Sequence, residues 1–237
     1  MSKPIVCLDP GHGPGNVNGS ADGTYLEYEF TMDLAERLGE KLEGRGVSVV
    51  LTRSSKGYPS LTERATTANR AGVDLFLSVH TNAAGASARG FVAYTSSGPE
   101  NAPRNRAAVD ILNAVHASGV VLFGTGKPYH QRFTVLTATM APAVLLECGF
   151  HTNAADTALL KDPAYRDTLA GAICDGVCQY LGVETDDPES GEPDQPSPWA
   201  AEAWRKAVAA GIFDGTDPQG PMSREQAAVV LDRLGLI

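Results

Sequence analysis

The 237-residue sequence contains few cysteines and no long hydrophobic run. Its four cysteines include no CxxC pair and are too sparse for a disulfide framework, so we expect reduced, mostly buried thiols. No apolar run approaches the length that spans a bilayer, which argues against membrane insertion. The first eight residues lack the charged head and apolar stretch of a signal peptide. We therefore expect a cytoplasmic chain, or one that leaves by a route not written in the sequence.

Basic residues are also scarce, and the acidic ones are concentrated. The net charge is −9, and residues 184–197 hold six acidic and no basic residues. No basic stripe exists, so nucleic-acid binding gains no support. Residues 184–198 also hold four prolines and no large apolar residue, a composition that predicts an extended linker. This linker separates a domain over residues 1–183 from a small piece over residues 199–237.

Several catalytic motifs are absent. The sequence contains neither GxSxG nor HExxH. Gly11-His12-Gly13 lacks the third glycine of a dinucleotide loop, and Gly126-Lys127 lacks the other residues of a P-loop. The chemistry must therefore be sought in residues that the fold brings together.

Strand and helix patterns alternate along residues 1–183. Apolar runs predict strands at 5–8, 47–51, 75–79, 90–95 and 143–146, with a further short strand at 133–136. Helical spacing of apolar residues predicts helices at 25–43, 61–71, 104–118 and 164–181. This order describes an α/β fold in which helices cover both faces of a mainly parallel sheet.

The C-terminal piece carries two short amphipathic patterns, at residues 200–210 and 223–234. They predict a small all-α module, and Ser223 with Gln226 forms a capping box for its second helix. About 40 residues are marginal as an independent fold. We therefore expect this module to dock, bind a ligand or self-associate.

Three of the predicted strands end in residues that bind metals or transfer protons. His12 follows the first strand in the loop Asp9-Pro10-Gly11-His12-Gly13, His80 follows 75–79, and Glu147 follows 143–146. A lone His12 would more simply be a surface-loop histidine, but the recurrence favours a site. Open α/β sheets bind ligands at the carboxyl ends of their strands, so we expect these side chains to meet there.

Two imidazoles and one carboxylate form a recurring ligand set of catalytic zinc. His12 and His80 supply the imidazoles, and Glu27 and Glu29 compete for the third position. Glu27 lies one turn before Phe30 on the predicted inward side, whereas Glu29 is rotated about 100° from Phe30. Glu27 is the better candidate, and its alternative role is to complement the helix dipole.

Glu147 has a different predicted role. A carboxylate at the end of an apolar strand, next to a cation, can accept a proton from water and deliver one to a leaving amine. The alternative is an ion pair with Arg132 or Arg53. Side chains alternate along a strand, so Cys148 points away if Glu147 points into the site, which argues against Cys148 as a nucleophile.

Four ordered segments carry a family resemblance: Leu-Asp-Pro-Gly-His-Gly (8–13), Glu27, Ser-Val-His-Thr-Asn-Ala (78–83) and Pro-Ala-Val-Leu-Leu-Glu-Cys-Gly-Phe (142–150). They resemble the signatures of zinc-dependent N-acetylmuramoyl-L-alanine amidases of the amidase-3 type, over about residues 4–182. The resemblance implies a mixed six-stranded sheet with flanking helices. It also implies one Zn²⁺ held by His12, Glu27 and His80, with Glu147 as the catalytic carboxylate.

The family's reaction is hydrolysis of the amide that joins N-acetylmuramic acid to the L-alanine of the peptidoglycan stem peptide. Without a signal peptide, the chain resembles a phage endolysin that waits in the cytoplasm until it is released to the cell wall. A sporulation or autolytic amidase fits the same features. A non-catalytic wall-binding protein on the same fold, or a zinc peptidase that cuts another amide, are further alternatives.

The C-terminal piece is similar to a single surface-layer-homology repeat, through Trp204, Gly211-Ile212 and residues 223–227. Such modules attach proteins to secondary cell-wall polymers. The alternative is homodimerisation through an apolar face with Trp199, Trp204 and Phe213.

Three further histidines carry weaker claims. We expect a structural role for His116, while His130 and His151 could each contact substrate. His151-Thr152-Asn153 departs from the family pattern, in which an apolar residue more often precedes Ser/Thr-Asn. The departure leaves the predicted metal ligands intact and concerns substrate contacts.

Overall fold

The computed structural model describes residues 3–20, 22–183, 201–213 and 229–231. The chain divides into two units, Met1–Glu184 and Thr185–Ile237. The division falls where the predicted linker starts, and the linker itself lies outside the described residues. Among the described helices, none combines the length and apolar character needed to cross a bilayer.

The first unit is built on one six-stranded sheet with the order β2-β1-β3-β6-β4-β5. The strands are β1 (Ile5–Pro10), β2 (Ser48–Leu51), β3 (Leu75–Asn82), β4 (Val92–Thr95), β5 (Tyr129–His130) and β6 (Ala143–Phe150). All neighbouring strands are parallel except β4 and β6, which are antiparallel. The predicted mixed, mostly parallel sheet is confirmed. Because β1, β3 and β6 are parallel neighbours, their carboxyl ends lie at one edge of the sheet.

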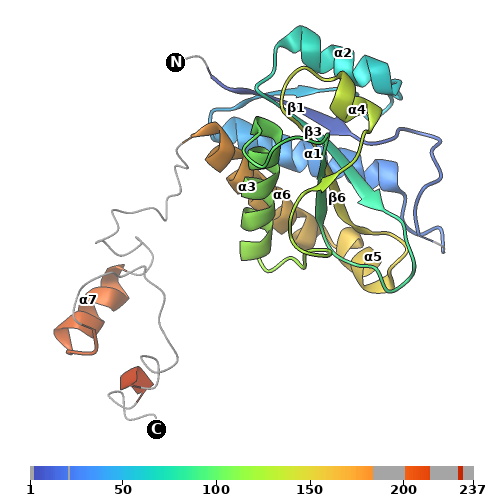
Figure 1. Cartoon of the computed structure of the whole chain (residues 1–237). Helices are drawn as coiled ribbons and strands as arrows, with labels where there is room; N and C mark the ends of the chain where they lie inside the picture. Colours follow the sequence, from blue (N-terminus) through green and yellow to red (C-terminus); the bar gives the residue numbers. More distant parts are fainter. Residues whose placement is uncertain (1–2, 21, 184–200, 214–228, 232–237) are drawn as a thin grey trace. The chain divides into compact units, whose positions relative to one another are not determined.

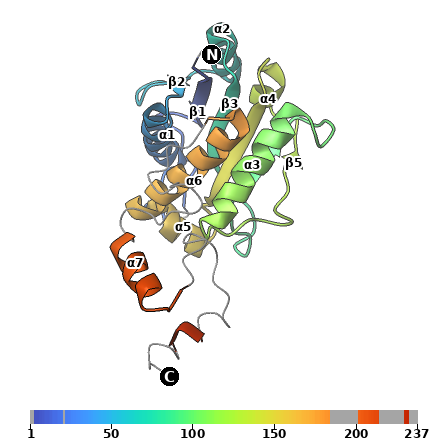
Figure 2. The same cartoon turned by 90° about the vertical axis from the view of Figure 1, so that its left-hand side faces the viewer.

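Helices cover both faces of this sheet, as predicted (Figures 1 and 2). The helices of the first unit are α1 (Glu27–Gly44), α2 (Leu61–Ala71), α3 (Pro103–Ala117), α4 (Thr134–Ala138), α5 (Ala154–Lys161) and α6 (Pro163–Leu181). Buried residues of α1, α3 and α6 share one hydrophobic core with Leu75, Leu77 and Val79 of β3. On the opposite face, residues of α2 and α4 pack with Phe76. The alternation along β3 therefore assigns its side chains to two cores.

Local residues fix the ends of several helices. Ser60 and Glu63 form a capping box at the start of α2, and Gly72 ends this helix in the left-handed conformation with φ 61°. Pro163 occupies the first turn of α6, where a missing N–H costs nothing. The predicted bounds of α2 match the structure, and α6 starts one residue earlier than predicted.

The predicted strand at 133–136 is wrong. The short helix α4 occupies this stretch, and the sixth strand is the two-residue β5 at Tyr129–His130. The β-branched Thr134 and Val135 favour a strand locally, but Val135 and Leu136 are buried against the sheet from a helix. Tertiary packing therefore overrides local propensity here. The helix α5 was not predicted.

All four cysteines are free and buried, as predicted. The second unit contains α7 (Ala201–Ala209), and residues 229–231 are also helical. Trp204 and Phe213 stack with ring centroids 4.9 Å apart, so part of the predicted apolar face is paired within the module. Trp199 and the predicted capping box of Ser223 with Gln226 lie outside the described residues.

Candidate metal centre

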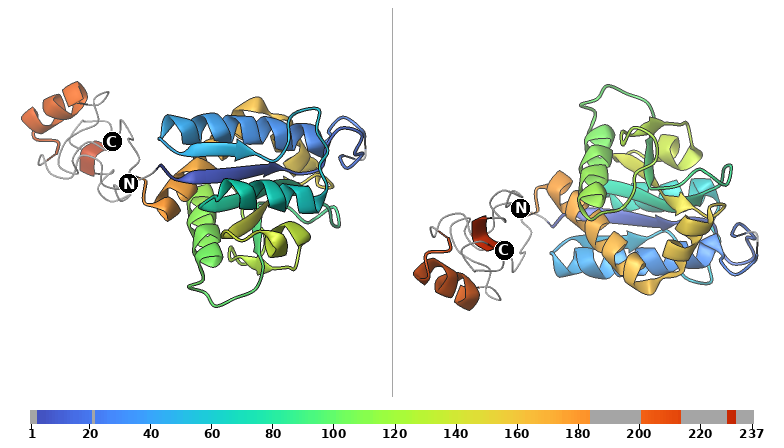
Figure 3. Two further views of the ribbon diagram at one scale, coloured as in Figure 1. Left: turned by 90° about the horizontal axis from the view of Figure 1, so that it is seen from above. Right: turned by 90° about the horizontal axis from the view of Figure 1, so that it is seen from below.

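Three predicted site residues meet at the carboxyl edge of the sheet. Each of His12, Glu27 and His80 offers one ligand atom, and these atoms lie within 4.8 Å of one another. His12 Nε2 is 3.2 Å from Glu27 Oε2, and His80 Nδ1 is 3.2 Å from Glu27 Oε1. Figure 3 shows the blue loop after β1 and the green segment after β3 leaving the sheet at the same end. Glu29 is exposed and accepts a hydrogen bond from the Tyr28 hydroxyl instead.

Glu27 is a buried carboxylate surrounded by donors. Its exposed fraction is 1%, and Oε1 accepts a hydrogen bond of 2.8 Å from the backbone N–H of Thr81. Burial by itself would raise the pKa of Glu27, but the hydrogen bonds and charges of His12 and His80 outweigh it and hold this pKa well below its ordinary value. The carboxylate therefore stays ionised, which is the form that binds a cation.

This donor set fits a divalent metal ion. Zinc bonds to imidazole nitrogen and carboxylate oxygen are about 2.0–2.2 Å long, so two donors on a tetrahedral ion lie about 3.3 Å apart. The two nitrogen–oxygen distances of 3.2 Å, one to each oxygen of the Glu27 carboxylate, are close to this separation. Among the residues that the structure describes, His12, Glu27 and His80 form the group of histidine and acidic side chains that lie close enough together to hold a metal ion.

The loop that carries His12 is held by two buried arginines. His12 adopts the left-handed conformation with φ 57°, which is uncommon for a residue other than glycine. Arg64 donates hydrogen bonds to the carbonyl oxygens of Pro10 and His12. Arg53 Nε donates a further bond of 2.8 Å to the Pro10 carbonyl. These bonds fix the backbone on both sides of His12.

Asp9 in turn fixes Arg64. Arg64 Nη1 lies 2.8 Å from Asp9 Oδ1, and both side chains are at most 3% exposed. The hydroxyls of Thr52 and Ser78 also donate to the Asp9 carboxylate. No sequence motif marks Arg64 as part of the site. In the sequence, Arg64 appears only as a charged residue next to Ala65, a buried residue of the amphipathic helix α2.

Gly11 lets the first strand approach His80. A Cβ atom at Gly11 would lie 2.4–2.6 Å from three atoms of the His80 ring. The two imidazole rings meet edge to face, with centroids 4.9 Å apart. Glycine at this position therefore sets the distance between the two histidines.

Glu147 lies beside His80, its register partner on the neighbouring strand. The residue is half-buried, and its Oε2 is enclosed without a hydrogen-bond partner among the described residues. Burial, and secondarily the charge of Glu27, raise the pKa of Glu147 well above its ordinary value. The alternative pairing with Arg53 is wrong, because that guanidinium donates instead to the carbonyl oxygens of Pro10, Gly11 and Tyr28. A carboxyl group with a raised pKa and a free oxygen suits proton transfer.

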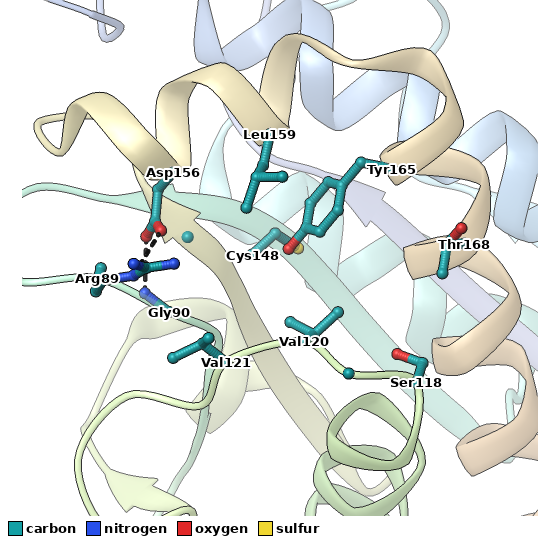
Figure 4. A pocket seen from close by; sticks show the side chains of 12 residues that line it. Arg89, Gly90, Ser118, Val120, Val121, Cys148, Asp156, Leu159, Tyr165 and Thr168 are labelled. Atoms are coloured by element: carbon teal, nitrogen blue, oxygen red, sulfur yellow. Dashed lines mark hydrogen bonds and ion pairs between the residues drawn. The ribbon is translucent and has the colours of Figure 1, made fainter. Parts of the chain in front are cut away.

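Cys148 points to the opposite face of β6, as the strand alternation predicts. It belongs to the core shared with α1 and α6, and burial raises the pKa of its thiol well above the ordinary value. It lines a cavity of about 300 Å³ together with Gly149, Asp156 and Tyr165 (Figure 4). Glu147 and the three metal-site residues do not line this cavity, so the cavity is separate from the candidate centre.

The remaining histidines lie outside the group. His116 and His130 are exposed on α3 and β5. His151 is only 7% exposed, and its Nδ1 lies 3.0 Å from the Thr81 hydroxyl. Burial lowers the pKa of His151 below its ordinary value. The ring of His151 is buried beside Thr81, and a contact between His151 and substrate stays a prediction.

A known protein family matches most of the first unit. The family model for N-acetylmuramoyl-L-alanine amidase, Amidase_3, matches residues 6–179. The chain belongs to this amidase family. The matched region contains all four residues placed at the sheet edge.

Two curated members of the family illustrate the likeness in sequence. The chain is 36% identical over 187 residues to the N-acetylmuramoyl-L-alanine amidase LytC of Bacillus subtilis, an alignment that covers 76% of this chain and 37% of LytC. It is 34% identical over 186 residues to the probable cell wall amidase LytH of Staphylococcus aureus, covering 77% of this chain and 60% of LytH. The chain thus spans between a third and two thirds of the length of these two relatives.

The amidase fold is also found among solved structures. The crystal structure of the N-acetylmuramyl-L-alanine amidase Ami1 from Mycobacterium smegmatis superposes with a TM-score of 0.71 at 30% identity. The superposition covers 76% of this chain and 98% of Ami1. The first unit therefore shares the fold of this amidase over almost the whole length of Ami1.

Proposed function

We propose that this chain is a zinc-dependent peptidoglycan hydrolase that cleaves the amide between N-acetylmuramic acid and the L-alanine of the stem peptide. Membership of the amidase family supports the reaction class. The proposal for this chain rests on one observation: His80 of the His12–Glu27–His80 group lies beside a second carboxyl group, Glu147, whose Oε2 has no hydrogen-bond partner among the described residues. A metal-binding set with an adjacent free carboxylate is what metal-assisted amide hydrolysis requires.

In this proposal, His12, Glu27 and His80 hold the ion, and the ionised Glu27 offsets part of its charge. A bound Zn²⁺ would act as a Lewis acid toward the scissile carbonyl and make water more acidic. The left-handed backbone at His12 and the absence of a side chain at Gly11 keep the two imidazoles in place. The ligands are thus preorganised before substrate arrives.

In this proposal, Glu147 transfers a proton from the attacking water to the leaving nitrogen. Its free Oε2 accepts a proton from the attacking water as the oxygen bonds to the carbonyl carbon. Its raised pKa lets it keep that proton and then pass it to the nitrogen of L-alanine as the carbon–nitrogen bond breaks. One carboxyl group therefore serves first as base and then as acid, and ends the cycle ionised.

The test is product analysis on purified peptidoglycan with the full chain, with and without a chelator. The proposal expects new N-terminal alanine, no new reducing sugar ends, and loss of product with the chelator. Reducing ends would indicate a glycosidase. A different new N-terminus would indicate a peptidase that cuts another amide. Binding to peptidoglycan without any product would indicate a non-catalytic wall-binding protein.

We also propose a phage endolysin role for the chain, with an amidase domain over residues 1–183 and the acidic linker joining it to the C-terminal module. A sporulation or autolytic amidase is the alternative, and neighbouring holin or sporulation genes would separate the two roles. For the module, we propose binding to a wall polymer, with homodimerisation as the alternative. Sedimentation of the chain with purified walls and its mass in solution distinguish these two functions.

A further inference from the structure

A buried hydrogen-bonded trio lies behind the candidate metal centre. The Tyr25 hydroxyl donates to Thr81 Oγ1 over 3.1 Å, and Thr81 Oγ1 lies 3.0 Å from His151 Nδ1. The three residues are at most 7% exposed, and the rings of Tyr25 and His151 stack with centroids 6.4 Å apart. These are direct contacts between residues far apart in the sequence, and the function described above uses none of them.

The protons available in the trio show which group donates in the hydrogen bond between Thr81 Oγ1 and His151 Nδ1. Thr81 Oγ1 already receives the proton of Tyr25, so its own proton needs an acceptor in a site closed to water. If His151 Nδ1 carried a proton, the Thr81 hydroxyl would face two donors, and its own proton would have no acceptor among these three residues. A buried donor without an acceptor costs about 1–3 kcal/mol. Thr81 therefore donates to an unprotonated Nδ1 of His151.

Each member of the trio stands close in sequence to a residue of the centre. Tyr25 precedes Glu27 by two positions, and Thr81 follows His80 directly. His151 follows Glu147 by four positions, and its backbone N–H donates to Asn82, the last residue of β3. The trio thus joins the start of α1 to the ends of β3 and β6.

Thr81 also connects the trio to the metal-binding carboxylate. The Thr81 hydroxyl contacts Tyr25 and His151, while the Thr81 backbone N–H donates a hydrogen bond of 2.8 Å to Glu27 Oε1. Fixing the Thr81 side chain fixes the peptide group that orients this oxygen. Partners that orient metal ligands in this way typically change metal affinity by about 10–100-fold when removed.

We propose that His151 is a positioning residue for the metal centre, acting through Thr81 on the Glu27 carboxylate. The inference rests on the proposed function, because it presumes that Glu27 binds the metal. His151 touches neither ligand nor substrate in this role. It supplies the acceptor that locks the Thr81 hydroxyl between two strand ends.

The test measures Zn²⁺ affinity of the full chain by competition with a chromophoric chelator, without substrate. His151→Leu keeps a side chain of similar size but removes the acceptor, and we expect affinity to fall about tenfold. His151→Asn offers an oxygen near the position of Nδ1, and we expect it to restore affinity to within about threefold of the wild type. A residue that only fills space would give the opposite ranking.

Thr81→Val completes the test, because it removes the hydroxyl and keeps the backbone N–H. We expect it to weaken Zn²⁺ binding about as much as His151→Leu, and the double variant to be no weaker than either single one. Ile173→Val, a buried change within α6, is the control for a small loss of core packing and should leave affinity unchanged. If His151→Leu does not fold, Thr81→Val and His151→Asn decide the question by the same expectations.

The outcomes separate the two proposals. Wild-type affinity in His151→Leu or Thr81→Val overturns the positioning role and leaves the proposed function standing. Equal losses in His151→Leu and His151→Asn also overturn it, because the acceptor would then be irrelevant. A wild-type chain that binds no Zn²⁺ overturns the proposed function, and the inference with it.

Discussion

Two buried carboxylates at the same sheet edge have opposite surroundings. Glu27 accepts a backbone hydrogen bond and contacts two histidines, and its pKa is held well below the ordinary value. Glu147 has an enclosed oxygen with no partner, and its pKa is raised well above the ordinary value. The same residue type is therefore held as an anion in one place and, in the proposed mechanism, carries the proton in the other.

The difference teaches that the donors around each carboxylate decide its role. Environments that push the pKa values of neighbouring acids apart are typical of sites that divide binding from proton transfer. Here the division coincides with the elements: Glu27 starts α1, where donors from the loop after β1 and from β3 converge, whereas Glu147 belongs to β6.

The largest effect is expected from Glu147→Gln on turnover. Glutamine keeps the shape but cannot accept or deliver a proton, so we expect the rate on peptidoglycan to fall by about 10²–10⁴-fold. The release of N-terminal alanine measures it. A rate near that of the wild type would mean that another group transfers the proton.

The substitution Asp9→Ala tests the buried Asp9–Arg64 ion pair, which supports the loop that carries His12. This change leaves Arg64 as a buried charge without its partner, and we expect the free energy of unfolding to fall by about 3–5 kcal/mol. Urea denaturation measures it. Asp33→Ala is the matched control, because the ion pairs of Asp33 with Arg37 and Arg166 are partly exposed and worth about 1 kcal/mol or less. Equal losses in both variants would show that the buried pair is not special.

The raised pKa of Glu147 predicts a gain in stability on its removal. A carboxyl group whose folded pKa exceeds its unfolded value costs stability as pH rises above that unfolded value, which is ordinarily 4.5. Without metal at pH 7, Glu147→Gln should therefore be more stable than the wild type, because the amide carries no charge that burial penalises. The gain should vanish near pH 4, where both states of the wild type are protonated.

Urea denaturation in chelator at the two pH values measures this difference. Equal stability of Glu147→Gln and wild type at pH 7 would show that Glu147 ionises without penalty in the folded chain. It would then resemble Glu27, and the contrast between the two acids would be lost.

The smallest effect is expected from Gly11→Ala. The added methyl group would overlap the His80 ring, so the ring must shift, and we expect Zn²⁺ affinity to fall about tenfold. Competition with a chelator measures it. Gly44→Ala at the end of α1 is the control, because its Cβ meets no atom within 4 Å and affinity should not change.

Local sequence patterns were enough to locate the site. His12, His80 and Glu147 each end an apolar run, and the parallel sheet then brings those ends to one edge. The choice of Glu27 over Glu29 followed from helical spacing alone, and the structure places Glu27 against the two histidines.

The hydrogen bonds that hold the residues of the candidate site in place could not be predicted in this way. Arg53 and Arg64 bind carbonyl oxygens more than 40 residues away, and no local pattern encodes such a partner. Thr81 was read only as part of a motif, because its two hydrogen-bonding roles appear once α1 and β6 are in place. The helix α4 was mistaken for a strand because its residues favour a strand until they are packed.

The metal content of Glu27→Gln and Glu147→Gln, measured side by side by elemental analysis after gel filtration, tests the central claim most directly. Both substitutions replace one carboxyl group at the same edge of the sheet by an amide of the same shape. We predict no stoichiometric zinc in Glu27→Gln and one zinc per chain in Glu147→Gln. Equal zinc contents in the two variants would contradict the assignment of one carboxylate to the metal and the other to the proton.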